Sequence, residues 1–143
     1  MTFDPCQPLA LTADADVTPS QRAGVEAGMG LWTSVMPVRL TLALASQGDG
    51  SDAAVTPAVP VHFQGAAANF HGLYDPATAQ IFINTDLAGA PLAIAVAHEV
   101  GHAFGLAHVS GDERKSVMNP GNLTVEPTQA DADTLMQTWG DCR

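Results

Sequence analysis

The sequence predicts a single α+β domain over residues 1–143, with a mixed twisted sheet and helices packed against it. Three observations support this prediction. A length of 143 residues suits one domain with its own core and is too short for two. Hydrophobic residues make up 46% of the chain and charged residues 14%, which is typical of globular rather than disordered proteins. Segments with the two-residue period of strands lie between segments with the 3.6-residue period of helices.

A first helix is predicted to start after Thr18. Thr18 is followed by Pro19 and Gln21, which together form a capping box with proline at the first helical position. Apolar side chains then recur at helical spacing, at Val25, Met29, Trp32 and Met36. We expect this stripe to face the core.

Several segments have the pattern of strands, and they predict a sheet of four or five. In "VRLTLALAS" (38–46), apolar residues alternate with polar or small ones, as in a strand with one buried face. The candidates are residues 9–12, 38–46, 59–64, 66–74 and 80–86. The last two are joined through a turn at Asp75-Pro76.

Two more helices are predicted in the second half of the chain. An apolar helix opens at Pro91, and Gly105 is positioned to end it. The last helix starts after the capping residue Thr128, has acids in its first turn and stops at Gly140. Its apolar face comprises Ala132, Leu135, Met136 and Trp139.

The charge and the hydropathy exclude two classes of partner. Fifteen acidic residues against five basic ones give a formal charge of −10, which repels nucleic acid and anionic lipid. The longest apolar stretch, residues 87–97, is broken by Gly89 and Pro91 and is shorter than the ~20 residues of a membrane helix. We therefore expect neither a nucleic-acid partner nor a membrane partner.

The two cysteines, Cys6 and Cys142, lie near opposite ends of the chain. A disulfide between them would tie both termini to the body and would stabilise the fold by about 4 to 5 kcal/mol in the chain-entropy model. Because disulfides persist in oxidising compartments, this pairing predicts a secreted or otherwise extracytoplasmic protein whose signal peptide is not in this chain. The alternative is a pair of unpaired buried thiols.

Three of the five histidines lie in "HEVGHAFGLAH". On the predicted helix, His98 and His102 are four residues apart and face the same side, so both imidazoles can bind one ion. Gly105 can adopt the left-handed conformation that turns the chain, which brings His108 back on a returning strand. Three neutral histidines with an open fourth position are typical of catalytic rather than structural zinc. Glu99 faces the same cavity without having to be a ligand.

The pattern HExxHxxGxxH is specific. From this composition, its five set positions should occur by chance on the order of 10⁻⁵ times in a chain of this length. Met118, in "SVMNP", lies ten residues beyond His108, and alone it would be an ordinary core residue. Together, the motif and Met118 resemble the metzincin clan of zinc endopeptidases, which combine an extended zinc signature with a Met-turn.

Within this clan, the chain is most similar to matrixin-like catalytic domains. The similarity depends on Pro120 after the Met-turn, on the strand and zinc helix in residues 80–102, and on the ending "LTVEPTQADADTLMQTWG". It implies an upper part, about residues 1–105, that holds the sheet and two helices. The lower part, about residues 106–143, would hold the third zinc ligand, the Met-turn and the last helix.

The resemblance also implies the chemistry. The three histidines, His98, His102 and His108, would bind one catalytic Zn²⁺. Glu99 would be the general base that activates a water molecule, and Met118 would lie beneath the metal as a hydrophobic floor. The protein is then expected to be a zinc-dependent endopeptidase that acts as a monomer on a peptide or protein substrate.

By the same resemblance, an extended substrate would pair with an edge strand and with the segment after the Met-turn. The candidates on the edge strand are Ala67, Ala68 and Asn69. The candidates after the Met-turn are Asn119, Pro120 and Gly121. Val117 and Leu123 would line a pocket for an apolar residue just after the cut.

Two other interpretations of the motif stay open. A catalytically silent zinc-containing binding module would have the same three ligands, although the presence of Glu99 argues against it. A stable scaffold without metal would use the imidazoles only for hydrogen bonds. The only tyrosine, Tyr74, lies far from the motif in sequence, so no role for it at the metal is expected.

Further metal sites have little support in the sequence. His62 and His71 are expected to be packing or surface residues, with a second metal site as the alternative. Candidate ligands for Ca²⁺ are Asp49, Asp52 and Asp75. Aspartates in loops more often form solvated turns, so a calcium ion has no firm basis.

Overall fold

The computed structural model describes residues 1–44, 56–65 and 71–142 as a mixed α+β fold, so the predicted fold class is confirmed at this level. A five-stranded sheet and three helices lie within these residues. The strands are β1 (Leu9–Ala13), β2 (Leu40–Leu44), β3 (Ala58–Gln64), β4 (Gly72–Asp75) and β5 (Gln80–Asn84). The helices are α1 (Pro19–Thr33), α2 (Gly89–Ala103) and α3 (Gln129–Trp139).

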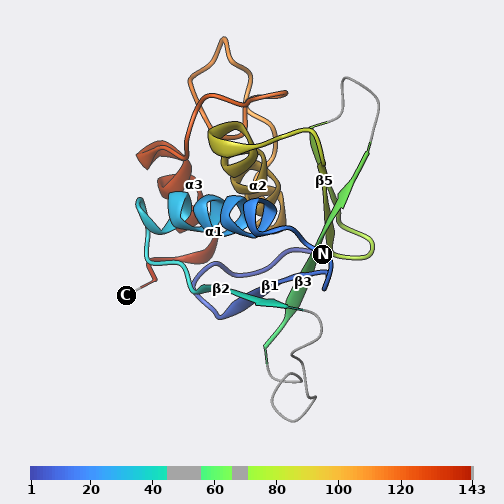
Figure 1. Ribbon diagram of the computed structural model, residues 1–143. Coiled ribbons are helices and arrows are strands. Elements are labelled where there is room, and N and C mark those ends of the chain that lie inside the picture. Colours follow the sequence, from blue (N-terminus) through green and yellow to red (C-terminus); the bar gives the residue numbers. More distant parts are fainter. Residues whose placement is uncertain (45–55, 66–70, 143) are drawn as a thin grey trace.

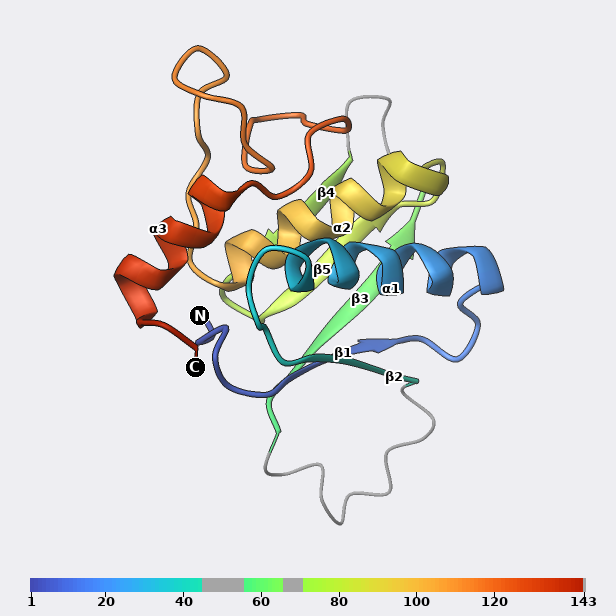
Figure 2. The same ribbon diagram turned by 90° about the vertical axis from the view of Figure 1, so that its left-hand side faces the viewer.

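The strand order across the sheet is β2-β1-β3-β5-β4. The pairs among β2, β1, β3 and β5 are parallel, whereas β4 runs antiparallel to β5, with Tyr74 opposite Ile81. Both α1 and α2 cover the same face of the sheet (Figures 1 and 2). Because β4 is the last strand in this order, its second edge has no strand partner among the described residues.

The first helix has the predicted cap and the predicted buried face. The Gln21 N–H donates to the Thr18 hydroxyl at 3.1 Å, and the Thr18 N–H donates to the Gln21 side chain at 3.0 Å. Three residues of the predicted stripe, Val25, Met29 and Trp32, are buried on α1. The fourth, Met36, is also buried but lies beyond the end of the helix at Thr33. The Trp32 indole N–H donates to the Ala97 carbonyl at 2.8 Å, which fixes α1 against the helix that carries the histidine motif.

Several boundaries differ from the predictions. Strand β2 begins at Leu40 rather than at residue 38, and β5 ends at Asn84 rather than at residue 86. Helix α2 begins at Gly89 rather than at Pro91. Proline is tolerated there because the N–H groups of the first helical turn have no partner within the helix. Strand β4 begins at Gly72, later than the predicted start at residue 66, and residues 66–70 lie outside the described ranges.

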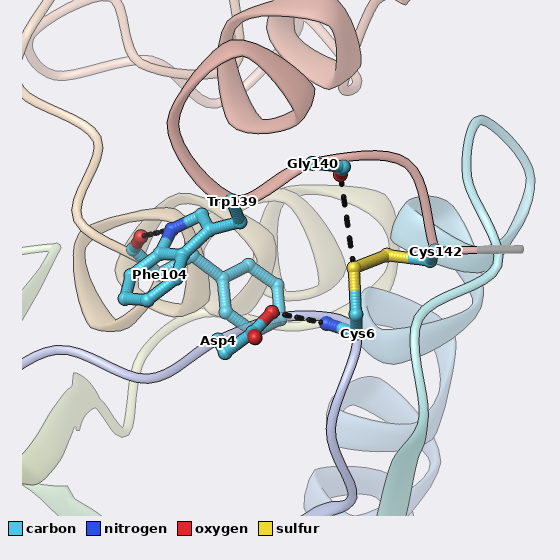
Figure 3. The surroundings of a disulfide bond; sticks show 6 residues. All are labelled: Asp4, Cys6, Phe104, Trp139, Gly140 and Cys142. Carbon is cyan, nitrogen blue, oxygen red and sulfur yellow. Dashed lines mark hydrogen bonds between the residues drawn. A yellow bond between two sulfur atoms is a disulfide. The ribbon is translucent and has the colours of Figure 1, made fainter.

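The disulfide between Cys6 and Cys142 is present, as predicted (Figure 3). The Trp139 indole, close to one end of this bridge, donates to the Phe104 carbonyl at 2.8 Å. The Phe3 N–H donates to the Ala103 carbonyl at 2.8 Å. Both terminal segments are therefore attached to the C-terminal end of α2.

Within the described residues, each helix is too short or too polar to cross a membrane.

Loss of the bridge is expected to destabilise the fold without changing its core. The bridge closes a loop with a sequence separation of 136 residues. Removal of a native disulfide from a small domain typically costs about 2 to 5 kcal/mol. Urea unfolding of the Cys6→Ser, Cys142→Ser double variant should show a loss in that range. The reduced wild type should match the double variant, and equal midpoints for the oxidised and reduced wild type would contradict the prediction.

Candidate metal centre

Helix α2 presents two of the three clustered histidines on one side. His98 and His102 are one helical turn apart, and their ring centroids are separated by 4.9 Å. His98 is only 7% exposed, and Glu99 beside it is 6% exposed, although most buried residues of this helix are apolar. Burial of two ionisable side chains in an apolar helix costs free energy of folding unless both find hydrogen-bond or metal partners. This cost makes the pair a candidate functional feature.

A glycine turn brings the third histidine to the same place. Gly105 has a φ of +99° and follows the last turn of α2, where its N–H donates to the His102 carbonyl at 2.9 Å. The chain then doubles back, and the Val109 N–H donates to the Met118 carbonyl at 3.0 Å. His108 lies in an irregular segment and not on the predicted returning strand, because no ladder of backbone hydrogen bonds forms in residues 106–110.

The ring nitrogens of the three histidines converge on one point. His108 Nε2 lies 3.3 Å from His98 Nε2 and 3.3 Å from His102 Nε2. One ligand atom from each of the three residues lies within 4.8 Å of the others. Tetrahedral zinc with Zn–N bonds of about 2.05 Å places its ligand nitrogens about 3.3 Å apart. The arrangement can therefore hold one metal ion such as zinc.

Backbone carbonyls determine which nitrogen of two rings faces the centre. His98 Nδ1 lies 2.7 Å from the Val117 carbonyl, and His102 Nδ1 lies 2.8 Å from the Leu106 carbonyl. A carbonyl only accepts hydrogen bonds, so each Nδ1 carries the hydrogen and each Nε2 presents a lone pair. This is the outer-shell arrangement that orients metal-bound histidines.

Hydrogen bonds among the three rings alone cannot satisfy both of the contacts that His108 Nε2 makes. A neutral His108 has at most one hydrogen on Nε2, so it can donate to His98 or to His102 but not to both. The other contact would then place two lone pairs 3.3 Å apart. A cation bound at the centre would accept all three lone pairs. The chemistry of the donor set thus fits a metal better than it fits a purely hydrogen-bonded scaffold.

The electrostatics of the site keep the buried rings neutral. The pKa of His98 is lowered to about 4, mainly by burial and also by the neighbouring His102 and His108, while the hydrogen bond to Val117 opposes the shift. Burial also lowers the pKa of His102. Neutral imidazole is the form that binds metals, so both rings are in the binding state near neutral pH.

Glu99 lies in the same cavity as the three rings. The cavity has a volume of about 430 Å³ and lies between α2 and β4. A side chain on Gly72 would place its Cβ 3.0 Å from Glu99 Oε2, so β4 approaches this carboxyl group closely. The pKa of Glu99 is raised to about 8 because burial outweighs the opposing hydrogen bond from the Tyr74 backbone. A cation at the three histidines would favour the carboxylate form.

Met118 is fully buried against the histidine helix. A Cβ on Gly101 would lie 2.5 Å from the Met118 sulfur, so only glycine fits at this position between Glu99 and His102. The Met118 N–H donates to the Ser116 hydroxyl oxygen at 2.9 Å. The neighbouring Val117 carbonyl accepts from His98 Nδ1, so this turn also orients one of the three rings.

The predicted substrate-binding residues fall into three groups. Gly121 lines the cavity, together with its neighbour Asn122. Asn119 and Pro120 do not line it, and the Asn119 amide instead donates to the Val109 and Arg114 carbonyls. The edge-strand candidates Ala67, Ala68 and Asn69 lie outside the described residues.

The apolar pocket proposed after the cut does not form as expected. Val117 is fully buried in the hydrophobic core and does not line the cavity. Leu123 does not line the cavity either. Among the described residues that line the cavity, the large apolar side chains that are exposed are Met1 and Leu73 of β4.

Several residues that line the cavity could not be predicted from any pattern in the sequence. Met1 and Thr2 line the cavity although they are about a hundred residues from the motif, and no local pattern marks them. His71 and Tyr74 also line it. The position of Tyr74 could have been anticipated only by recognising its strand as the sheet edge beside the histidine helix.

No second metal cluster occurs among the residues that the structure describes. His62 instead contacts Asp14 at 3.1 Å and Gln80 at 2.8 Å. Asp75 accepts hydrogen bonds from the Ala77 N–H and the Thr78 hydroxyl, as in a turn. The calcium candidates Asp49 and Asp52 lie outside the described ranges.

Comparison with models of known protein families finds no match for this chain, and a search among curated proteins finds none either. The fold and the site therefore define the class of the protein by themselves. It is a mixed α+β protein with a candidate three-histidine metal centre that opens into a cavity.

Proposed function

We propose that the protein is a zinc-dependent endopeptidase of the metzincin type, similar to matrixin-like catalytic domains. One observation carries this proposal. Glu99 is buried in the same open cavity as the converging nitrogens of His98, His102 and His108. Three histidines would hold a structural metal without such an acid, whereas hydrolysis needs a base beside the metal.

The residues of the site have distinct roles in the proposed reaction. His98, His102 and His108 would hold the zinc ion, which would supply Lewis-acid chemistry at the scissile carbonyl and would lower the pKa of water to about 7. Glu99 takes a proton from the attacking water and gives it to the amide nitrogen as the C–N bond breaks. The Tyr74 backbone N–H donates a hydrogen bond to the Glu99 carboxylate and so would restrict its position. The products are two peptides, and no residue forms a covalent bond to the substrate.

The proposed setting is extracytoplasmic. The disulfide between Cys6 and Cys142 is a feature common in extracellular proteins. A peptide or a protein with an exposed segment would be the substrate, and a monomer would suffice because one chain supplies all the site residues named here.

Replacement of Glu99 is the direct test of this function. Hydrolysis of casein and of a broad peptide mixture is compared between the wild type and Glu99→Ala. Loss of a general base is expected to lower kcat/KM by about 10² to 10⁴-fold. The bound zinc, measured by elemental analysis, should stay the same, because Glu99 is not a ligand.

The matched control is Glu26→Ala, which removes an exposed glutamate that pairs with Arg22 on α1 and should leave hydrolysis unchanged. A wild type that binds one zinc but cleaves none of these substrates would contradict the endopeptidase function and favour the catalytically silent binding module. An inert wild type that never takes up metal would favour the hydrogen-bonded scaffold.

A further inference from the structure

One side chain of the cavity wall makes four hydrogen bonds to the backbone around it. Asn122 lines the cavity beside its neighbour Gly121. Its amide nitrogen donates to the Val117 carbonyl at 3.2 Å and to the Val125 carbonyl at 2.7 Å. Its amide oxygen accepts from the N–H groups of Thr124, at 3.0 Å, and Val125, at 2.8 Å. Both hydrogens of the amide and both lone pairs of its oxygen are therefore used.

The orientation of the Asn122 amide follows from its partners. The two carbonyls can only accept a hydrogen bond, and the two backbone N–H groups can only donate one. Of the two possible orientations of the amide, only the one with nitrogen toward the carbonyls and oxygen toward the N–H groups satisfies all four partners. An aspartate at this position could donate no hydrogen bond when ionised, and a serine only one. The four bonds together therefore require asparagine.

The Val117 carbonyl is shared between Asn122 and one of the three clustered histidines. It accepts from His98 Nδ1 at 2.7 Å as well as from Asn122. A carbonyl oxygen has two lone pairs, so both are used here. The N–H of the same buried residue donates to the Asp131 carboxylate at 3.1 Å. The residue that orients the His98 ring is therefore held at its N–H by Asp131 and at its carbonyl by Asn122.

The same amide also holds the cavity wall. Gly121 has a φ of +68°, and the Asn122 N–H donates to the Asn119 carbonyl at 3.1 Å, which closes a tight turn. The Asn122 side chain then joins Val117, which precedes this turn, to Val125, which follows it. The wall at residues 121–122 is therefore connected, through one side chain, to the carbonyl that His98 contacts.

We propose that Asn122 is a positioning residue of the metal centre, which fixes the direction of the His98 ring and the cavity wall together. Its amide acts on the ring through the Val117 carbonyl and needs no contact with the metal or with a substrate. This inference rests on the zinc centre of the proposed function. It adds to that centre a residue that lies outside the HExxHxxGxxH pattern and that no zinc-binding motif marks.

The first experiment measures the Kd for zinc by competition with a chromophoric chelator, for the wild type, Asn122→Ser and Asn122→Ala. Both variants lack the amide nitrogen that contacts the Val117 carbonyl, so both should bind zinc about 10-fold more weakly, as is typical of outer-shell changes. The control is Thr18→Ala, which destabilises the fold by removing the cap of α1, at a residue that lines a separate cavity. It should keep the wild-type Kd.

A second experiment follows the His98 ring and the wall separately, by hydrogen exchange measured with NMR on the zinc-loaded proteins. The hydrogen on His98 Nδ1 should exchange faster in both Asn122 variants than in the wild type and Thr18→Ala, because its acceptor is less constrained. The amide hydrogens of Thr124 and Val125 report on the wall. Both should exchange faster in Asn122→Ala, whereas the hydroxyl of Asn122→Ser can still accept from the Thr124 N–H.

The outcomes separate this inference from the function on which it rests, and none of them needs hydrolysis. If the wild type binds one zinc but Asn122→Ser keeps either its Kd or its His98 exchange rate, the positioning role is wrong while the metal centre stands. An equal loss of zinc affinity in Thr18→Ala would also overturn the inference, because the effect would then follow general stability. A wild type that binds no zinc would contradict the metal centre itself, and the inference with it.

Discussion

Replacement of His102 by alanine is expected to abolish stoichiometric zinc binding and, with it, all hydrolysis. The ring supplies one of three Nε2 atoms that converge within 4.8 Å, and a two-histidine remnant cannot complete a tetrahedral site. Loss of an outer-shell partner alone costs about 10- to 100-fold in metal affinity, so loss of the ligand itself should cost at least about 100-fold. Competition with a chromophoric chelator at fixed pH measures the change in the Kd for zinc.

A matched histidine separates this effect from general damage to the cavity. His71 lines the same cavity but does not belong to the converging group, so His71→Ala should keep one zinc per chain. The helix should stay folded in His102→Ala, because its neighbours in α2 form the apolar contacts with α1. Equal zinc affinity for wild type and His102→Ala would show that His102 is not a zinc ligand and would contradict the proposed metal centre.

The sequence predicts those parts of the site that depend on local geometry. The spacing of His98 and His102 is a property of one helix, and Gly105 provides the turn that returns His108. The helix caps at Thr18 and Thr128 are also local, and both form as predicted. These features need only a few neighbouring residues, so their signals lie within short windows.

The parts that the sequence does not predict depend on contacts between distant segments. No local pattern places Met1 beside Tyr74, more than seventy residues away, or sets the order of the five strands. The burial of Asp131 is a similar case. In the sequence it is an ordinary acid in the first turn of a helix, whereas in the structure it is fully buried and accepts hydrogen bonds from Arg114 and Ser116, as well as from the N–H of the capping residue Thr128. Such roles emerge only when tertiary packing brings the partners together.

Replacement of Asp131 by alanine is expected to cost about 3 kcal/mol of unfolding free energy. Its carboxylate accepts from the Ser116 hydroxyl at 2.6 Å, the Val117 N–H at 3.1 Å and Arg114 at 2.8 Å. Removal of one partner of a buried ionic network leaves the others unpaired, which typically costs about 3 to 5 kcal/mol. The lower figure applies because the Arg114 side chain is 30% exposed and can be solvated. Urea unfolding at neutral pH measures the loss.

The pH dependence of this contribution distinguishes the charge from the packing. Burial raises the pKa of Asp131, but hydrogen bonds from Ser116, Thr128, Arg114 and Val117 outweigh it and leave the pKa below its ordinary value of 3.8. A folded-state pKa that is depressed contributes stability fully above 3.8, and this stability is lost as the pH falls through the lower folded value. The difference in unfolding free energy between wild type and Asp131→Asn should therefore be constant near neutral pH and should decrease below about pH 4.

The exposed Asp133 on the same helix provides the control. Asp133→Ala removes an exposed acid that accepts from the Gln129 amide one turn earlier on α3, and it should change stability by less than about 0.5 kcal/mol. In Asp131→Ala, the turn at residues 116–118 loses its attachment to α3, and the Val117 carbonyl that orients His98 loses its support. We therefore expect weaker zinc binding by about 10-fold, the range of outer-shell changes. An Asp131→Ala protein with wild-type stability and wild-type zinc affinity would show that the hydrogen bonds of Asp131 neither stabilise the fold nor support the metal centre.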